Sequence, residues 1–223
     1  MPERSHARKE REAMARTTRL VFPTLTTERS LWQRDLHVVA GVDEVGMGPL
    51  AGPVVAAAVV FPPADGEDAA IFPQGVRDSK TLTAKARARL DQEIRQVALA
   101  VSIGVVEVED IDRLNIYHAG LKAMRLALEH LSLQPEHVLI DGRSLSDLPC
   151  PHTRYVKGDR DIYSIAAASI IAKVYRDDLM VAFDRLYPQY GFARHMGYGT
   201  VAHRDALRRF GPCPLHRRSF RLF

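Results

Sequence analysis

GVDEVGMGPLAGP, at residues 41–53, places two adjacent acids, Asp43 and Glu44, directly before a glycine-rich turn. The two features suit different chemistry. A glycine-rich turn can bind the phosphates of a dinucleotide, whereas paired acids can hold a metal ion against a substrate that carries its own phosphates. The surrounding sequence has to decide between these two kinds of site.

The glycine spacing disfavours a dinucleotide site. A dinucleotide-binding fingerprint needs G-x-G-x-x-G running from a strand directly into a helix. From Gly46 the spacing is G-x-G-x-x-x-G, with one proline inside it and a second directly after it, and a strand-like run follows instead of a helix. The carboxylates just upstream would also repel phosphates, so the acids become the better lead.

Apolar runs and helical patterns alternate along the chain on both sides of this turn. Thr83 is placed to cap a helix at residues 83–97, and Asp161 to cap a helix at residues 162–186. The second helix carries apolar or small residues nearly all round at its start, so it should be buried. We expect strands at residues 37–43, 54–61, 98–108, 137–142 and 153–159, and helices at residues 83–97, 109–131 and 162–186. This order predicts an α/β fold with a mixed five-stranded sheet flanked by helices.

The chain has 223 residues, of which 46% are hydrophobic, which suits one large domain. Residues 1–30 lack hydrophobic periodicity and are expected to form a basic, mobile tail before a single domain at residues 31–223. No apolar run reaches the roughly 18 residues of a membrane-spanning helix, and the charged start does not resemble a secretory signal. Two cysteines cannot build a disulfide framework, so we expect a reduced, cytoplasmic enzyme without membrane association.

The formal net charge is +4, and basic residues gather near both ends of the chain. Clustered Arg and Lys side chains are typical of proteins that contact phosphates. A solvated surface that keeps the protein soluble is an equally good explanation at this point.

Acids at the ends of two apolar strands point to one shared site. Asp141 is the last residue of the apolar run VLID, and Asp43 is the last residue of the apolar run HVVAGVD. Such carboxylates are costly unless they are paired, hydrogen-bonded or bound to a metal. Glu44 should face away from Asp43, so both acids can serve one site only if the strand breaks there. The alternative is that Asp43 and Asp141 only cap turns.

A fourth acid, Asp159, lies just before the last helix in KGDRD and has no evident structural task. Four clustered acids cannot all ionise cheaply without cations, which indicates Mg²⁺ or Mn²⁺. Zinc is disfavoured because no His or Cys pair has the spacing of zinc ligands.

Eight motifs follow one another along the chain: GVDEVGMGPLAGPVVAAAVVF, DSKTL, LNIYHAGLKAM, LIDG, VKGD, SIAAASIIAKVYRD, YGFARHMGYGT and GPCPLHRRSF. In their order and spacing the sequence resembles the bacterial ribonuclease HII family over roughly residues 36–220. The resemblance implies an RNase H-like fold with a C-terminal helical segment. It also implies endonucleolytic cleavage of RNA in RNA–DNA hybrids and nicking on the 5′ side of single ribonucleotides in duplex DNA.

The resemblance assigns roles to individual residues. The family's four metal-binding acids correspond to Asp43, Glu44, Asp141 and Asp159. In the family these acids bind two Mn²⁺ or Mg²⁺ ions. Asp159 fits this family better than the related ribonuclease HIII, which has Glu there. The expected contacts to substrate are Gly46, Met47 and Gly48 through their backbone at the 2′-hydroxyl, Tyr198 against the sugar at the RNA–DNA junction, and Lys80, Lys173 and Arg217 at phosphates or acids.

The chain departs from the family at two positions, and both changes remove a positive charge. Met47 and Met196 stand where relatives usually carry a basic residue, in G-R-G or G-K-G and in H-K-G-Y. We expect weaker substrate binding or a relaxed junction preference. Ser169 and Asn115 also lie in matching motifs, where core hydrogen bonding is the expected role.

The chain ends in SFRLF, which resembles short peptides that dock on replication sliding clamps but lacks their leading Gln. Packing of this tail on the domain is the favoured alternative. Nothing in the sequence demands more than a monomer. A catalytically silent binder of RNA–DNA hybrids is the second hypothesis for function, disfavoured because all four acids are present.

Overall fold

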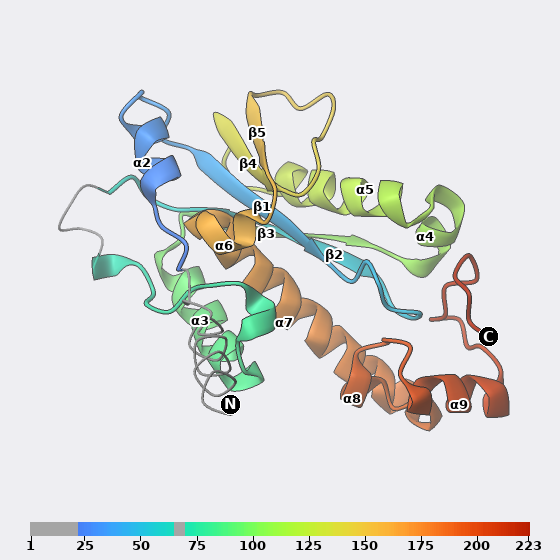
Figure 1. The fold of residues 1–223 in the computed structure, drawn as a ribbon. Coiled ribbons are helices and arrows are strands. Elements are labelled where there is room, and N and C mark those ends of the chain that lie inside the picture. Colours follow the sequence, from blue (N-terminus) through green and yellow to red (C-terminus); the bar gives the residue numbers. More distant parts are fainter. Residues whose placement is uncertain (1–21, 65–69) are drawn as a thin grey trace, which may run out of the picture.

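The computed structural model describes residues 22–64 and 70–223, and its centre is a five-stranded sheet (Figure 1). The strands are β1 (Val39–Val45), β2 (Val54–Val60), β3 (Ala100–Val106), β4 (His137–Asp141) and β5 (His152–Tyr155). Their order in the sheet is β3-β2-β1-β4-β5. β2 runs antiparallel to both β1 and β3, whereas β4 is parallel to β1 and β5 to β4. The predicted mixed five-stranded sheet is confirmed.

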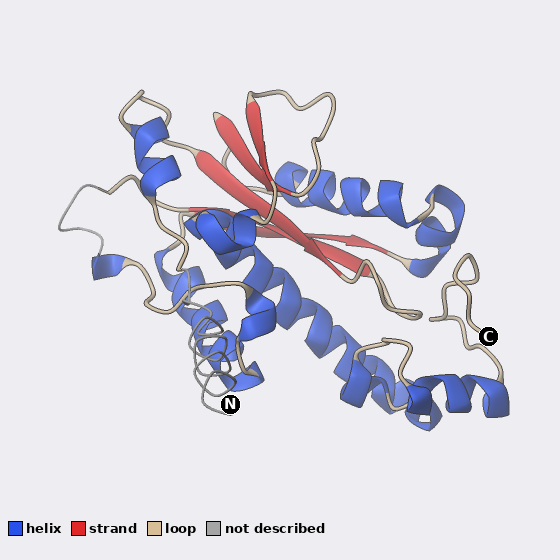
Figure 2. Cartoon of the chain, viewed as in Figure 1, coloured by secondary structure: helices blue, strands red, loops and turns tan. Residues whose placement is uncertain are grey.

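Helices cover both faces of the sheet (Figure 2). α4 (Val108–Leu114) and α5 (Ile116–Glu129) lie on one face, and α3 (Ala84–Val97) and α7 (Tyr163–Leu186) on the other. The segment after α7 contains η3 (Pro188–Tyr190), α8 (Phe192–His195) and α9 (Val201–Phe210). It packs around the far end of α7 with its own apolar cluster. The remaining short helices are α2 (Thr26–Trp32), η2 (Ser79–Thr81) and α6 (Gly158–Asp161).

Small residues let the helices approach the sheet closely. β2 reads VVAAAVV and is buried along its whole length, because both of its faces are covered. On β1, a Cβ added at Gly41 would lie 2.5 Å from Cβ of Ser164 and would also overlap its backbone carbonyl carbon. On β3, a Cβ at Gly104 would lie 2.5 Å from the backbone nitrogen of Ala127. These glycines therefore set the distance between the sheet and its two main helices.

The expected helix at residues 109–131 is wrong as a single element. It is two helices, α4 and α5, separated at Asn115, whose φ is +66°. Asn tolerates this left-handed φ better than most residues, and its Oδ1 accepts hydrogen bonds from the backbone N–H groups of Tyr117 and His118. Asn115 is exposed, so it caps α5 and makes no core hydrogen bond. The expectation for Ser169 is confirmed, since its Oγ lies 2.7 Å from the buried Oγ of Ser79.

The N-terminus of α7 is capped from outside its own sequence neighbourhood. Thr83 caps α3 as expected, but Asp161 does not cap α7: it ends α6, and Ile162 holds the N-cap position. The backbone N–H of Ser164 instead donates to Oε1 of Glu28 at 2.8 Å. Glu28 is buried in α2, so the expected boundary between tail and domain at residue 30 falls inside a packed helix. The remainder of the expected tail, residues 1–21, lies outside the described residues.

We expect Glu28→Ala to destabilise the protein by about 1–2 kcal/mol, because α7 loses an acceptor at its N-terminus. Glu28→Gln keeps an oxygen for the N–H of Ser164 and removes a charge that burial disfavours. Burial raises the pKa of Glu28 above its ordinary value. The cost of the charged carboxylate is therefore absent at low pH and grows as pH rises through the folded-state pKa.

Urea denaturation at pH 4 and pH 7 checks this prediction. Gln should be better tolerated than Ala at both values, and its free energy of unfolding relative to the parent should be higher at pH 7 than at pH 4. A Gln variant as unstable as the Ala variant at pH 7 would contradict the capping role.

Candidate active site

The sheet brings Asp43 and Asp141 level with each other. β1 and β4 are parallel with Val42 opposite Ile140, so the next residue on each strand is one of these acids. β4 ends at Asp141, whereas β1 continues to Val45 against β2. Both acids therefore lie where β1 passes the end of its neighbour.

The strand does not break at Asp43 and Glu44, contrary to the condition expected for a shared site. The ladder to β2 continues regularly through both residues. Asp43 shares its face with Gly41, which abuts α7, while Glu44 lies on the face of α5, where a Cβ at Gly120 would lie 4.0 Å from its Cγ. The charge of Asp141 still raises the pKa of both Asp43 and Glu44. It can do so because β4 ends at Asp141, and beyond this residue no backbone of β4 separates the two faces of β1.

Asp159 joins this group from α6. The backbone N–H of Gly158 donates to Oδ1 of Asp141 at 2.6 Å, which ties α6 to the end of β4. Asp159 is buried, and Nζ of Lys80 lies 4.0 Å from its Oδ2. Lys80 itself is largely exposed, so this cation faces solvent and the acids at once. The structure thus groups all four predicted acids with Lys80.

Mutual repulsion marks the group electrostatically. Burial raises the pKa of Asp43 well above its ordinary value, and the charges of Glu44, Asp141 and Asp159 raise it further. Burial, again the largest cause, also raises the pKa of each of these three neighbours. The charge of Lys80 opposes the rise in pKa of all four acids. Excess negative charge in a partly desolvated place is the condition that a bound cation relieves.

The donor set suits a hard divalent cation. Its members supply carboxylate oxygens only, the ligands preferred by Mg²⁺ and Mn²⁺. Within residues 22–64 and 70–223, no three His, Cys, Asp or Glu side chains stand close enough together to hold one ion as they are placed. Binding would therefore draw the carboxylates inward, against the repulsion that the ion itself cancels.

Arg217, expected at a phosphate, is instead buried under the turn that follows β1. It is 0% exposed, and its guanidinium donates to backbone carbonyls of Gly46, Pro49, Gly52 and Pro53 at 2.7–3.2 Å. Its donors are used and no solvent reaches it, so direct phosphate contact is corrected to support of the turn.

A second buried arginine, Arg176 of α7, was not predicted. Its guanidinium donates to the carbonyls of Ala51, Pro53 and Met196 at 2.9–3.1 Å. It therefore links the turn to the segment just before Tyr198. The pattern of small residues at the start of α7 carried no signal for it, because its role depends on a loop more than a hundred residues away.

Tyr198 lies beside the turn. A Cβ at Gly48 would lie 3.6 Å from Cε1 of Tyr198, whose side chain is 45% exposed. Its backbone is held from below: Nδ1 of His203 lies 2.9 Å from the carbonyl of Tyr198, and Nε2 of His203 lies 3.0 Å from Nε2 of the buried His216. The exposed backbone of Gly48 and the exposed ring of Tyr198 are therefore neighbours at the surface.

The other expected contacts are less direct. Nζ of Lys173 lies 2.5 Å from Oδ1 of Asp177, so its charge is already paired and a phosphate contact is not supported. Met47 and Met196 both turn toward apolar clusters, Met47 over Gly120 of α5 and Met196 at the far end of α7.

Two charged residues near the acids were missed. Asp78, which caps η2, contributes to the raised pKa of Asp141 and Asp159. Arg143, two residues after Asp141, opposes the rise in the pKa of Glu44. The nearby motifs DSK and LIDG could have pointed to both, since each residue lies in or directly after one of them.

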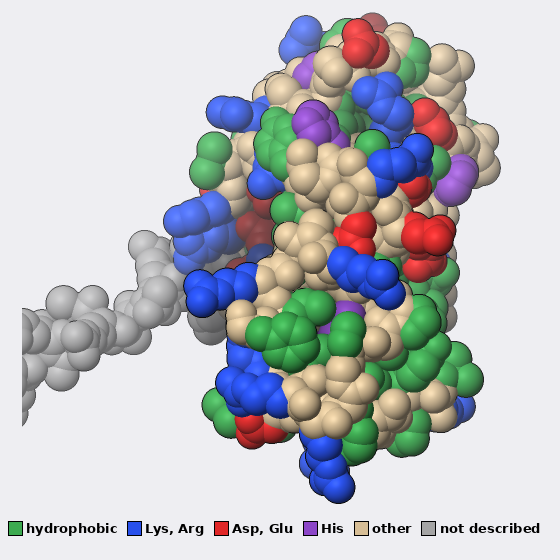
Figure 3. All heavy atoms as spheres, turned by 90° about the vertical axis from the view of Figure 1, so that its right-hand side faces the viewer, with side chains coloured by type: hydrophobic (Ala, Val, Ile, Leu, Met, Phe, Trp, Pro, Cys, Tyr) green, Lys and Arg blue, Asp and Glu red, His purple; other side chains and the backbone are tan. Residues whose placement is uncertain are grey.

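On the face drawn in Figure 3, Lys and Arg side chains lie in several groups with acidic side chains between them. The basic cluster expected in the N-terminal tail lies outside the described residues. The C-terminal tail packs as favoured: Leu222 is buried and its carbonyl accepts a hydrogen bond from Arg204, while Phe223 stays exposed.

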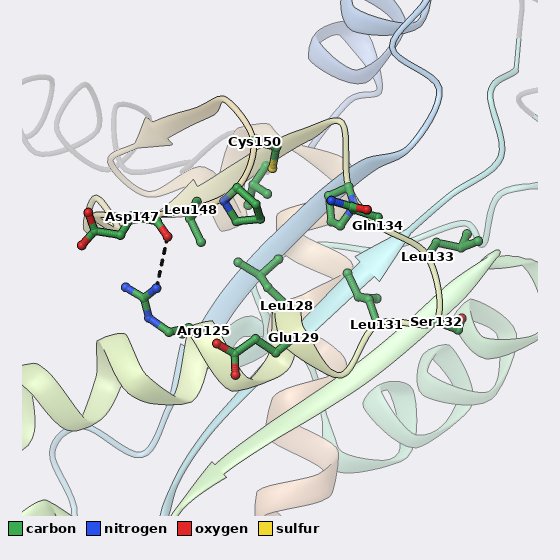
Figure 4. Close-up of a pocket in the computed structure, with 13 residues that line it drawn as sticks. Arg125, Leu128, Glu129, Leu131, Ser132, Leu133, Gln134, Asp147, Leu148 and Cys150 are labelled. Atoms are coloured by element: carbon green, nitrogen blue, oxygen red, sulfur yellow. Dashed lines mark hydrogen bonds between the residues drawn. The ribbon is translucent and has the colours of Figure 1, made fainter.

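A pocket of about 480 Å³ lies at the opposite edge of the sheet (Figure 4). It is lined by the end of α5, residues 131–135 before β4 and residues 147–150 before β5. Since β4 and β5 both begin at this edge, the pocket is separated from the acids by the length of β4. It takes no part in the site.

The sheet order, together with acids grouped where β1 passes the end of β4, defines a protein of RNase H-like fold with an acidic site at the end of β4. The family model described as Ribonuclease HII matches residues 40–223. A ribonuclease HII from Synechococcus sp. (strain JA-3-3Ab) is 52% identical over 205 residues, which cover 91% of this chain and 90% of the relative. One from Moorella thermoacetica is 52% identical over 194 residues, covering 87% and 91%. The chain belongs to the ribonuclease HII family, whose members are metal-dependent endonucleases.

Solved structures agree on the fold. The ribonuclease H2 from Pyrococcus horikoshii OT3 superposes with a TM-score of 0.69 at 24% identity, over 82% of this chain and 94% of that one. The ribonuclease HII in a complex with PCNA from Archaeoglobus fulgidus gives 0.68 at 24% identity, over 82% and 95%. A ribonuclease HIII in complex with Mn²⁺ gives 0.64 at 22% identity, over 87% and 71%. Among the described residues of this chain, no helix combines the length and apolar character needed to cross a membrane.

Proposed function

We propose that this protein hydrolyses RNA in RNA–DNA hybrids and nicks duplex DNA on the 5′ side of embedded ribonucleotides. The observation that carries the proposal is the group of four carboxylates at the end of β4, in a chain that belongs to the ribonuclease HII family. The expected products are a 3′-hydroxyl and a 5′-phosphate.

Asp43 and Asp141 are proposed as the central ligands of two Mn²⁺ or Mg²⁺ ions, with Glu44 and Asp159 completing the two coordination shells. Bound ions of this kind activate a water molecule and stabilise charge on the leaving 3′ oxygen. The chain contributes placement. The hydrogen bond from Gly158 orients Asp141, and the adjoining ladder of β1 and β2 keeps Asp43 and Glu44 on a rigid strand.

The turn and Tyr198 are proposed to recognise the ribonucleotide, with backbone groups of Gly46, Met47 and Gly48 at the 2′-hydroxyl. Arg217 binds the carbonyls of Gly46 and Met47, so the N–H groups of Met47 and Gly48 in the same trans peptides point away from its guanidinium. Arg176 holds the carbonyl of Pro53 at the end of the turn. An N–H and a carbonyl can both bind a 2′-hydroxyl, the group by which RNA differs from DNA. The ring of Tyr198 beside Gly48 would pack against the neighbouring deoxyribose.

A nicking assay on a duplex with one embedded ribonucleotide tests this function. Cleavage should occur with Mn²⁺ or Mg²⁺, stop in EDTA, and be absent from an all-DNA duplex of the same sequence. Binding of the duplex without cleavage at any metal concentration would replace the proposal with a silent hybrid-binding protein.

Gly48→Ala is expected to separate folding from recognition. Gly48 is not among the glycines with a positive φ, and the nearest atom to an added Cβ is Cε1 of Tyr198 at 3.6 Å. The free energy of unfolding should therefore change by less than about 0.5 kcal/mol. The methyl group would hold the sugar away from the backbone, and kcat/KM on the one-ribonucleotide duplex should fall about 10-fold. Unchanged kcat/KM in a normally stable variant would show that the sugar does not approach Gly48.

Met47→Arg is expected to tighten binding of the one-ribonucleotide duplex. Met47 is partly buried over Gly120, and a longer side chain can keep its aliphatic part there while its charged end reaches solvent and a phosphate. Each added phosphate contact increases affinity at low salt and steepens its salt dependence, here by about 3- to 10-fold in affinity. Binding titrations at two salt concentrations, with Met47→Leu as the uncharged control, measure this. No gain over Met47→Leu would refute it.

We further propose a monomeric, cytoplasmic enzyme whose C-terminal tail can contact a sliding clamp. Support for the clamp contact comes from the SFRLF ending and from the Archaeoglobus fulgidus relative solved with PCNA. Leu222 is buried, so the tail would have to leave the domain or present Phe223 alone. A pull-down with a clamp protein should capture the full-length chain and lose it when residues 219–223 are removed; equal capture would refute the contact. Light scattering checks the monomer.

A further inference from the structure

Arg143 stands out among the charged residues beside the acids. It follows Asp141 and Gly142 at the end of β4, and its guanidinium carbon lies 4.3 Å from the centre of the Tyr117 ring. A guanidinium over an aromatic face is attracted to it and keeps a fixed orientation. Tyr117 is 45% exposed, so the pair lies at the surface.

This pair borders the site on the side of α5. Gly120, one turn after Tyr117 on the same helix, lies next to Met47 and Glu44. Arg143 lies two residues after Asp141, so its backbone begins at the same end of β4 as the acids. Lys80 approaches the same group of acids from η2, beside Asp159. Two cations therefore flank the acids from different elements.

The guanidinium has unused hydrogen-bonding capacity. Nη1 of Arg143 is buried, and it has no hydrogen-bond partner anywhere in residues 22–64 and 70–223. A buried N–H group without an acceptor is costly. Because the Arg143 side chain as a whole is partly exposed, a rotation of its guanidinium would bring this N–H to an acceptor supplied by a ligand. Planar, bidentate donation to oxygen is what a guanidinium offers to a phosphate.

We propose that Arg143, held by Tyr117, binds a phosphate oxygen of the nucleic-acid strand beside the cleaved bond. The placement of that phosphate rests on the proposed function, but the contact itself does not require cleavage. The competing role is neutralisation of Glu44, in which Arg143 touches no substrate. The two roles differ in what happens to DNA binding when the arginine is removed.

Binding titrations in EDTA with the full-length chain and a one-ribonucleotide duplex, at four salt concentrations, test the contact. Arg143→Gln should weaken binding about 5- to 10-fold at low salt and reduce the slope of log K against log salt by about one. Arg89→Gln is the matched control, because Arg89 pairs with Glu93 on the exposed face of α3 and its removal changes net charge equally. Tyr117→Phe should bind normally, since the aromatic face remains, whereas Tyr117→Leu should lose part of the affinity.

The outcomes separate this proposal from the proposed function. A reduced slope in Arg143→Gln supports the phosphate contact even if the parent protein cleaves no ribonucleotide duplex. A slope equal to that of Arg89→Gln overturns the contact even if the parent cleaves normally. Tighter Mn²⁺ binding by Arg143→Gln with an unchanged slope would overturn it as well, and would assign Arg143 to Glu44 alone.

Discussion

Asp43→Asn should lower nicking activity at least about 1000-fold, which corresponds to about 4 kcal/mol of lost transition-state stabilisation, while making the protein more stable in EDTA. The activity falls because an amide oxygen is a weak substitute for a buried carboxylate at a divalent cation. Stability rises because burial, and after it the charges of Glu44, Asp141 and Asp159, hold the pKa of Asp43 well above the ordinary value. Removing one of these like charges relieves a cost that the fold bears for function.

The stability gain is expected to be about 1–2 kcal/mol. The existing hydrogen bond from the backbone N–H of Glu44 to Oδ1 of Asp43 can be kept by the Asn oxygen. Thermal unfolding in EDTA and in Mn²⁺ measures both halves of the prediction. Mn²⁺ should stabilise the parent protein but not the variant, because ligands that bind the folded state stabilise it.

Asp205→Asn is the control, since Asp205 is exposed and pairs only with Arg208 on α9 among the described residues. It should change neither activity nor the response to Mn²⁺. If Asp43→Asn is less stable than the parent in EDTA, the stability half of the prediction is wrong. The carboxylate of Asp43 would then add more to the free energy of unfolding than its repulsion from the other acids subtracts.

Gly41→Ala should destabilise the protein by at least about 3 kcal/mol and disturb the site with it. The new Cβ would overlap the backbone of Ser164 and approach its Cβ to 2.5 Å, so β1 and α7 would have to separate. Asp43 lies two residues along the same face, and Ser164 is the residue that Glu28 caps. One methyl group would therefore move both the central acid and the start of α7.

Urea denaturation of Gly41→Ala beside Gly48→Ala compares a crowded glycine with one that has room. The double variant Gly41→Ala with Ser164→Gly should recover only part of the loss, because the backbone of Ser164 remains in the way. A loss below about 1 kcal/mol for Gly41→Ala would mean that the contact between β1 and α7 yields easily.

The strands and the acids could be predicted because their signals are local. Apolar β-branched runs predicted the first four strands, and Asp43 and Asp141 were recognisable as carboxylates at the ends of such runs. The fifth strand was expected at residues 153–159 but spans His152–Tyr155, and Asp159 belongs to α6. The break at Asn115 was missed because helical periodicity continues across it, and only its left-handed backbone separates α4 from α5.

The roles of basic residues could not be predicted in the same way. Arg217 and Lys80 are both cations in motifs, yet one is buried under the turn and the other faces the acids. Whether a guanidinium meets carbonyls or solvent depends on which distant segments pack around it. Arg176, Arg143 and the cap from Glu28 depend equally on contacts between segments far apart in the chain.

The sequence by itself determined the α/β class, the five strands, the four acids and the glycines of the turn, because periodicity, composition and motif spacing are properties of neighbouring residues. Only the tertiary structure decided that the acids converge where β1 passes the end of β4, since parallel pairing sets Asp43 level with Asp141. It alone decided that Arg217 supports the turn while Arg143 lies over the ring of Tyr117 near Glu44. Burial and hydrogen bonding between distant segments assign these roles, and neither is encoded in the spacing of any single motif.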